Sequence, residues 1–166
     1  IIVAFESKGP ILYTQERVGE GSKTFGILKF RSMIADAEKD GKPRWAQAND
    51  SRITRFGKFM RRTRIDELPQ LINVLRGEMS FVGPRPERPF FVSQLKQRIP
   101  LYDARHTVKP GLTGWAQVRH SYAASEEDSR AKLEYDLLNK KNHTLLLDIL
   151  VLIETAGVVV TGKGAR

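Results

Sequence analysis

Two acidic residues stand directly before a Leu-Pro pair in the stretch 61–87, and this arrangement limits how the chain can fold there. Asp66 and Glu67 precede Pro69. Proline has no backbone N–H, so it is tolerated in the first turn of a helix but not in the interior. The sequence therefore predicts a helix that begins beside the acid pair. Its apolar residues recur at helical spacing and are expected to face the core: Leu68, Leu71, Ile72 and Leu75.

The acid pair has two interpretations. Asp66 can cap the following helix, and Glu67 can be a first-turn acid that the helix dipole favours. Alternatively, the two carboxylates hold a divalent metal ion or attack a phosphorus atom. The arginines on both sides of the pair favour this second interpretation, because guanidinium groups match phosphate oxygens. The motif alone leaves both open.

A rigid turn follows the predicted helix. After a short extended run over residues 79–82, the sequence reads Gly83-Pro84-Arg85-Pro86. The two prolines restrict the backbone, so Arg85 has little conformational freedom left to lose on binding. Such an arginine suits a phosphate group, while an exposed turn arginine is the plainer alternative.

The N-terminal third of the chain predicts a β-hairpin. Residues 11–15 and 24–30 are extended runs on either side of a glycine-rich turn. Lys29 and Arg31 give the second run more charge than a packed sheet usually carries. A short helix is predicted over residues 33–39, followed by a mobile surface loop over residues 41–50.

A basic amphipathic helix is predicted over residues 52–62, with Ser51 as its cap. Its apolar side can face the core, or it can enter a membrane surface while the arginines pair with anionic headgroups. Both alternatives stay open on this pattern.

The C-terminal part predicts two more helices. One begins at a Ser125 cap and runs to residue 141, and the other covers residues 144–160 as a buried or interfacial helix. Asp148 and Glu154 interrupt the second, so a membrane span is not expected. Trp115 is expected in the core. The whole pattern predicts a single α+β domain over 1–166, mostly helical, with a small hairpin or sheet and amphipathic helices at a membrane interface.

Charge and composition narrow the chemistry. The net charge of +9 favours polyanions, anionic lipids or phosphorylated substrates. The absence of cysteine excludes disulfides, thiolate zinc sites and cysteine nucleophiles, and the three dispersed histidines lack the spacing of a metal site. Two other functions compete on these grounds. One is a basic nucleic-acid-binding module, and the other is a metal-dependent diphosphate hydrolase.

Six sequence blocks in register carry a resemblance along nearly the whole chain. They read SKGP (7–10), QERVG (15–19), KFRSM (29–33), DELPQ (66–70), GPRP (83–86) and KPGLTGW (109–115). Together they resemble the bacterial sugar transferases known as monotopic phosphoglycosyl transferases. The stretch 119–122 and the basic tail 162–166 are more similar to the exopolysaccharide-associated branch.

The resemblance implies transfer of a sugar phosphate from a UDP-sugar to a polyprenyl phosphate, with release of UMP, at the cytoplasmic face of the bacterial inner membrane. It does not imply nucleic-acid binding. It also implies a hydrophobic re-entrant helix before residue 7, of which only residues 1–5 could belong to this chain.

The resemblance also implies roles for individual residues. Asp66 would be the nucleophile that forms a covalent phosphosugar intermediate, and Glu67 the acid associated with Mg²⁺, so that both carboxylates lie at the metal site. Arg61 and Arg85 match arginines that family members use, and Lys29 and Arg31 can add charge that neutralises the donor diphosphate. Two further acids match C-terminal family positions, of which Asp148 is expected at the substrate site: Asp136 and Asp148.

Overall fold

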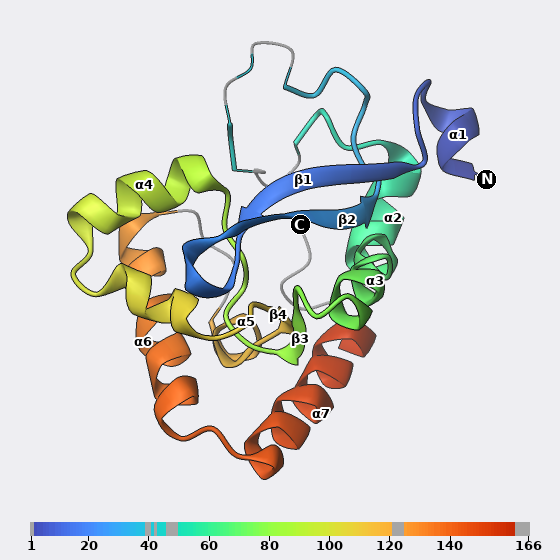
Figure 1. Cartoon of the computed structure of the whole chain (residues 1–166). Coiled ribbons are helices and arrows are strands. Elements are labelled where there is room, and N and C mark those ends of the chain that lie inside the picture. Colours follow the sequence, from blue (N-terminus) through green and yellow to red (C-terminus); the bar gives the residue numbers. More distant parts are fainter. Residues whose placement is uncertain (1, 39–40, 42, 46–49, 121–124, 162–166) are drawn as a thin grey trace.

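The computed structural model describes residues 2–38, 41, 43–45, 50–120 and 125–161. Within these ranges the chain is α+β and mostly helical, as predicted. The N-terminal helix α1 (Ile2–Glu6) is followed by the hairpin of β1 (Leu12–Val18) and β2 (Thr24–Phe30). The hairpin lies above a body in which α2, α3 and α7 form one side and α4 and α6 the other (Figure 1).

The predicted hairpin is confirmed. Its strands are antiparallel, with Leu12 opposite Phe30 and Val18 opposite Thr24. The 3₁₀ turn η1 (Glu20–Ser22) joins them. Gly21 lies in this turn at φ +64°, a left-handed conformation that glycine adopts without steric cost.

The predicted helix over residues 33–39 is wrong as far as the structure describes it. Met33 instead forms an isolated antiparallel bridge with Ile53. Turns follow at residues 35–38, and residues 39–40 lie outside the described part. Pairing with a distant segment has overridden the local helical preference here, because the bridge needs an extended backbone at Met33.

The loop over residues 41–50 lies only partly within the described residues. In that part it is not purely a surface loop, because Asp50 is buried and pairs with Arg52 at 2.6 Å. The Trp45 ring is half-buried and stacks on Phe91 with 4.3 Å between ring centroids.

Helix α2 (Arg55–Arg62) begins later than predicted. Its N-cap is Thr54, whose hydroxyl accepts a hydrogen bond from the Gly57 amide at 3.0 Å, rather than Ser51. Residues 51–52 form a turn and Ile53 pairs with Met33 in an extended bridge, so the helix can start only after Ile53.

The orientation of α3 (Gln70–Leu75) reverses the prediction. The side chains of Gln70 and Asn73 are buried, and the apolar residues that were expected in the core are exposed. Asn73 receives a hydrogen bond from the Leu28 amide and donates to the Gly26 carbonyl and Glu78. The exposed residues are Leu68 (52%), Leu71 (38%), Ile72 (41%) and Leu75 (87%).

The main hydrophobic core lies between β1, α4 (Pro89–Arg98), the 3₁₀ helix η3 (Tyr102–Thr107) and α6 (Glu126–Lys141). Ser125 caps α6 through a capping box with Asp128, which confirms the predicted start. The core side chains are Val18, Phe91, Val92, Leu95, Ile99, Tyr102 and Leu133.

A second, parallel pair of strands lies near the centre of the body. Strand β3 (Ser80–Val82) pairs with β4 (Gly111–Thr113), and the predicted extended run at residues 79–82 is confirmed. A Cβ atom on Gly111 would lie 2.2 Å from the Gly83 nitrogen, so glycine is required for this close approach.

The helices α5 (Trp115–Arg119) and α7 (Leu145–Thr161) complete the fold. Trp115 is half-buried rather than in the core, and the Arg119 guanidinium lies over its ring. Val151 is the buried residue of α7, while most of its other apolar side chains are exposed. Among the described residues, no helix is long and apolar enough to cross a membrane.

We expect Asn73→Ala to lower the free energy of unfolding by about 2 kcal/mol, because it leaves the half-buried Leu28 amide and Gly26 carbonyl without the Asn73 side chain that pairs with both. Urea unfolding measures this change. Leu75→Ala on the same helix is the control and should shift stability by less than about 0.5 kcal/mol. Equal losses in the two variants would contradict the observed orientation of α3.

Candidate active site

The acid pair lies in a 3₁₀ turn between two helices. This turn, η2 (Ile65–Glu67), follows Arg64, whose φ of +58° turns the chain sharply after α2. Asp66 does not cap α3, because the N-cap position is Pro69 and no side-chain cap bond is formed there. The helix-cap interpretation is therefore wrong, and both carboxylates are buried instead.

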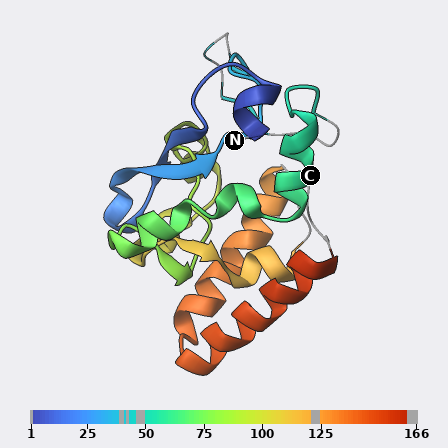
Figure 2. The same ribbon diagram turned by 90° about the vertical axis from the view of Figure 1, so that its right-hand side faces the viewer.

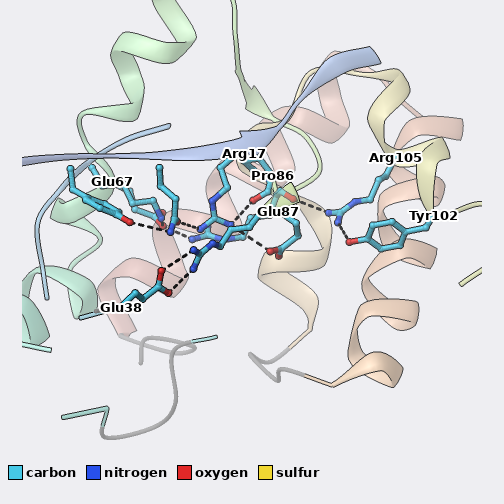
Figure 3. Close-up of polar contacts among 12 residues, drawn as sticks. Arg17, Glu38, Glu67, Pro86, Glu87, Tyr102 and Arg105 are labelled. Carbon is cyan, nitrogen blue, oxygen red and sulfur yellow. Dashed lines mark hydrogen bonds and ion pairs between the residues drawn. The ribbon is translucent and has the colours of Figure 1, made fainter. Parts of the chain in front are cut away.

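Two cations hold Glu67 in place (Figure 3). Its Oε1 accepts a hydrogen bond from Nη2 of Arg85 at 2.5 Å and from Nζ of Lys29 at 3.4 Å. Burial disfavours the charged carboxylate, but Arg85 and Lys29 outweigh this effect and hold the pKa of Glu67 well below its usual value. Glu67 is thus a fixed negative charge at neutral pH. Burial also lowers the pKa of Lys29, and Glu67 opposes that shift.

Asp66 is in the opposite situation. Its Oδ1 is buried, and no hydrogen-bond partner for it lies within the part of the chain that the structure describes. Burial raises the pKa of Asp66, and the adjacent Glu67 charge raises it further, while Lys29 and Arg61 lower it in part. One carboxylate of the pair is therefore bound by cations, and the other keeps a free oxygen. Carboxylates whose environments separate their pKa values in this way are typical of active sites.

A cavity of about 460 Å³ opens beside the pair. Both strands of the hairpin, α2, η2, η3 and α6 contribute to its wall, and Asp66 and Glu67 lie among its lining residues. Arginine and lysine outnumber the acids in this lining. A concave, cationic site of this size suits a small phosphorylated ligand rather than an extended nucleic-acid strand, which basic side chains along an outer surface would bind.

The predicted rigid turn places Arg85 at this cavity. The Gly83 amide bonds to the Thr113 carbonyl, and the Gly111 amide bonds to the Pro84 carbonyl, so β4 anchors the start of the turn. The Arg85 side chain then reaches Glu67. Arg85 is therefore part of an ion cluster rather than an exposed turn residue.

The other predicted site residues do not all line the cavity. Arg61 lines the cavity and donates from Nε to the Ser32 hydroxyl at 2.8 Å. Arg31 also lines it, but its buried guanidinium donates to backbone carbonyls of Val3, Ser7 and Lys8. Asp148 is not among the described residues that line the cavity, and its carboxylate lies 3.3 Å from His143.

The cavity wall also holds polar residues that were not predicted as site residues, and three of them are arginines that form hydrogen bonds to distant segments. Arg17 donates to the Pro86 carbonyl at 3.1 Å, Arg105 donates to the Arg85 carbonyl at 2.9 Å, and Arg88 makes two hydrogen bonds to Glu38. These contacts join segments up to 69 positions apart. Sequence periodicity carries no signal for them, because each depends on how distant segments come together.

The carboxylates fit a magnesium ion only in part. Within the described ranges, no three His, Cys, Asp or Glu side chains form a metal-binding group. Mg²⁺ commonly binds one or two carboxylates and completes its coordination with water and substrate phosphates. The orphaned Oδ1 of Asp66 beside Glu67 has the donor chemistry of such a site.

The chain is similar to enzymes of known activity. A family described as "Bacterial sugar transferase" matches residues 1–162. The UDP-N-acetylgalactosamine-undecaprenyl-phosphate N-acetylgalactosaminephosphotransferase of Aeromonas hydrophila is 49% identical over 166 residues, which cover 100% of this chain and 39% of that protein. The UDP-glucose:undecaprenyl-phosphate glucose-1-phosphate transferase of Xanthomonas campestris pv. campestris is 42% identical over 98% of this chain and 34% of its own length.

A third relative is covered more fully. The exopolysaccharide production protein PSS of Rhizobium leguminosarum bv. phaseoli is 36% identical over 99% of this chain and 85% of its own length. The chain thus spans well under half of the first two relatives and most of the third.

We expect Asp66→Asn and Glu67→Gln to change stability in opposite directions at pH 7. Asp66 has a raised pKa, so its ionised form opposes folding, and Asp66→Asn should increase the free energy of unfolding. Glu67 has a lowered pKa, so its charge stabilises the fold above the usual glutamate pKa, and Glu67→Gln should cost about 2 kcal/mol.

Urea unfolding between pH 3 and pH 7 tests both effects. The gain in Asp66→Asn should shrink as the pH falls below the ordinary aspartate pKa, where Asp66 is protonated in the folded and unfolded states. The cost of Glu67→Gln should diminish as the pH falls toward the lowered pKa of Glu67. Changes of the same sign at pH 7 would contradict the assigned electrostatics.

Proposed function

The chain belongs to the bacterial sugar transferase family, and from that premise we propose that it transfers a sugar phosphate from a UDP-sugar to a polyprenyl phosphate and releases UMP. One observation carries the proposal. In a basic cavity, an acid held by Arg85 and Lys29 stands beside an acid that keeps a free oxygen. The transfer would be the first membrane step of exopolysaccharide or glycoconjugate synthesis.

Asp66 is the nucleophile in this proposal. A carboxylate oxygen of Asp66 bonds to the phosphorus next to the sugar, and the bond from that phosphorus to the bridging oxygen breaks. UMP departs with that oxygen and its electron pair. The unpartnered Oδ1 of Asp66 supports this role, because an oxygen already committed to hydrogen bonds is a weaker nucleophile.

The cations around Asp66 make the approach of two anions possible. Lys29, Arg61 and Arg85 line the same cavity and can neutralise the diphosphate. We further propose that Asp66 and Glu67 hold Mg²⁺ together with the donor diphosphate, where the ion supplies additional charge neutralisation. Arg85 fixes the orientation of the Glu67 carboxylate, which would be one of the two groups that hold the ion.

The polyprenyl phosphate completes the reaction. Its phosphate oxygen attacks the phosphorus on Asp66, the bond to the carboxylate oxygen breaks, and Asp66 regains its free carboxylate. One cavity then serves both half-reactions in turn, so the donor and the lipid acceptor need not be bound together.

An apolar surface beside the site suits a lipid acceptor. It is formed by exposed side chains of α2, η2, α3, β3 and α7. The ribbons of α2, α3 and α7 lie on the side that faces the viewer in Figure 2. We propose that this surface rests on the cytoplasmic face of the bacterial inner membrane. Its members include Phe59, Leu68, Leu71, Ile72, Leu75, Phe81, Ile149 and Ile153.

We predict that the full-length protein, incubated with Mg²⁺ and a UDP-sugar but without acceptor, releases UMP and carries a sugar phosphate on the peptide that contains Asp66. Asp66→Asn should reduce UMP release by about a thousandfold or more, because it removes the nucleophile. A panel that includes UDP-N-acetylgalactosamine and UDP-glucose, read by UMP release and peptide mass, measures both effects. EDTA should abolish release.

Asp103→Asn is the matched control, because Asp103 is exposed on η3 and pairs with Lys96 outside the cavity lining. It should retain the wild-type rate. Labelling that persists in Asp66→Asn would remove Asp66 as the nucleophile. Free sugar phosphate without any labelled enzyme would indicate hydrolysis by water instead.

The membrane proposal predicts selective protection of the apolar surface. Leu75 is 87% exposed on α3, and Leu101 is 74% exposed shortly after α4, a helix on the opposite side of the body from α3 (Figure 1). In Leu75→Cys, a water-soluble maleimide should react at least about tenfold more slowly when anionic phospholipid vesicles are present. Leu101→Cys should react at the same rate with and without vesicles, as judged by mass spectrometry of the peptide. Equal rates for Leu75→Cys would contradict the proposed orientation.

A further inference from the structure

Arg105 lies at the centre of a buried polar cluster behind the Gly83–Pro86 turn. It comes from η3, and 7% of its side chain is exposed. Its Nη2 donates to the carbonyl oxygen of Arg85 at 2.9 Å and lies 2.8 Å from Oδ2 of Asp136. Its Nη1 donates to the Tyr102 hydroxyl at 2.7 Å (Figure 3). One guanidinium thus joins η3, α6 and the turn.

The carbonyl that Arg105 holds belongs to the residue that contacts Glu67. Pro84 and Pro86 restrict the backbone on both sides of Arg85. The direction of the Arg85 side chain therefore depends mainly on how the whole turn is held against the rest of the protein. Arg17 holds the next carbonyl, that of Pro86, from strand β1. Two guanidiniums from distant segments therefore seat the turn that aims Arg85 at Glu67.

Arg105 also lines the cavity, so a direct contact with substrate phosphate is the competing interpretation. Its hydrogen bonds argue against a primary phosphate role. Nη2 donates to the Arg85 carbonyl and is in ion-pair contact with Asp136, and Nη1 donates to Tyr102. A guanidinium that binds phosphate would use its paired Nη donors on the ligand.

An ion pair between Arg105 and Asp136 lies at the centre of the cluster. Asp136, of which 3% of the side chain is exposed, supplies the counter-charge that a buried guanidinium requires. Burial opposes the charge on Arg105, but Asp136 and Tyr102 outweigh burial and raise its pKa. Burial raises the pKa of Tyr102 to about 12, so its hydroxyl stays neutral. Burial raises the pKa of Asp136, and the adjacent Arg105 opposes that shift.

We propose that Arg105, held by Asp136 and Tyr102, is a positioning residue for the sugar-phosphate transfer: it seats the Arg85 turn so that the Arg85 guanidinium meets Glu67 and the donor phosphate. The inference rests on the proposed function. It assigns to Arg105 an effect that acts through Arg85 rather than through substrate contact. Asp136, on α6, then supports the site without facing the reacting atoms.

A double-mutant cycle between Arg105→Lys and Arg85→Lys tests this in the full-length protein. Lysine keeps the positive charge at residue 105 but cannot donate to three acceptors in one plane. In the wild-type background, Arg105→Lys should lower kcat for UMP release about tenfold and change KM for the UDP-sugar by less than about twofold. In the Arg85→Lys background, the same change should lower kcat by less than about twofold.

Equal losses in both backgrounds, or an effect confined to KM, would overturn the positioning role. Arg98→Lys is the matched control, because Arg98 is an exposed arginine that pairs with Glu126 on the surface. It should leave kcat unchanged. Thermal unfolding of each variant separates a loss of folded protein from a loss of rate.

Hydrogen exchange supplies a readout that does not need activity. The peptide covering residues 81–89 should exchange faster in Arg105→Lys than in the wild type and in Arg98→Lys, because the turn has lost one of the two guanidinium groups that hold its carbonyls. Unchanged exchange in that peptide would overturn the inference. A wild-type protein that releases no UMP from any UDP-sugar would instead overturn the proposed function, and the exchange result would still decide whether Arg105 seats the turn.

Discussion

The ion cluster of Glu67 with Arg85 and Lys29 is the interaction on which the rest of the site depends. It joins three separate parts of the chain: the turn after α2, the Gly83–Pro86 turn and strand β2. A carboxylate buried to this degree is stable only with cations beside it, so the three segments must come together for any one of them to be seated. The cavity forms where they meet.

The same cluster determines the chemistry of its neighbour. Because Glu67 is already paired, its charge acts on Asp66 as a fixed negative field and raises the Asp66 pKa together with burial. Asp66 gains no compensating hydrogen bond at Oδ1 from the described residues. The fold therefore tolerates an unfavourable carboxylate at Asp66, a cost to stability that the proposed role of Asp66 as nucleophile would explain.

Local patterns predicted the elements of this fold better than their orientation. The hairpin, the extended run before Gly83 and the Ser125 cap each depend on neighbouring residues, and the structure confirms them. The predicted core face of α3 was wrong, because Asn73 takes its partners from β2, about 45 positions away. Likewise, Met33 forms a bridge with Ile53 instead of beginning a helix. Which face of α3 is buried, and whether Met33 is in a bridge or a helix, depends on contacts with distant segments.

Within the candidate site, the acid pair and Arg85 could be recognised from the sequence because a short motif and a proline-bounded turn carry them. Arg105 could not, since its role depends on a carbonyl 20 positions away and on Asp136 from α6.

The exposed leucines on α3 show that the sequence also does not determine what an apolar helix face contacts. An apolar stripe indicates that a face avoids water, but it does not say whether protein or lipid covers it. On α3, the hydrogen bonds of buried Asn73 fix which face of the helix is turned inward. The polar face is bonded to β2, so the leucines are exposed on the opposite face.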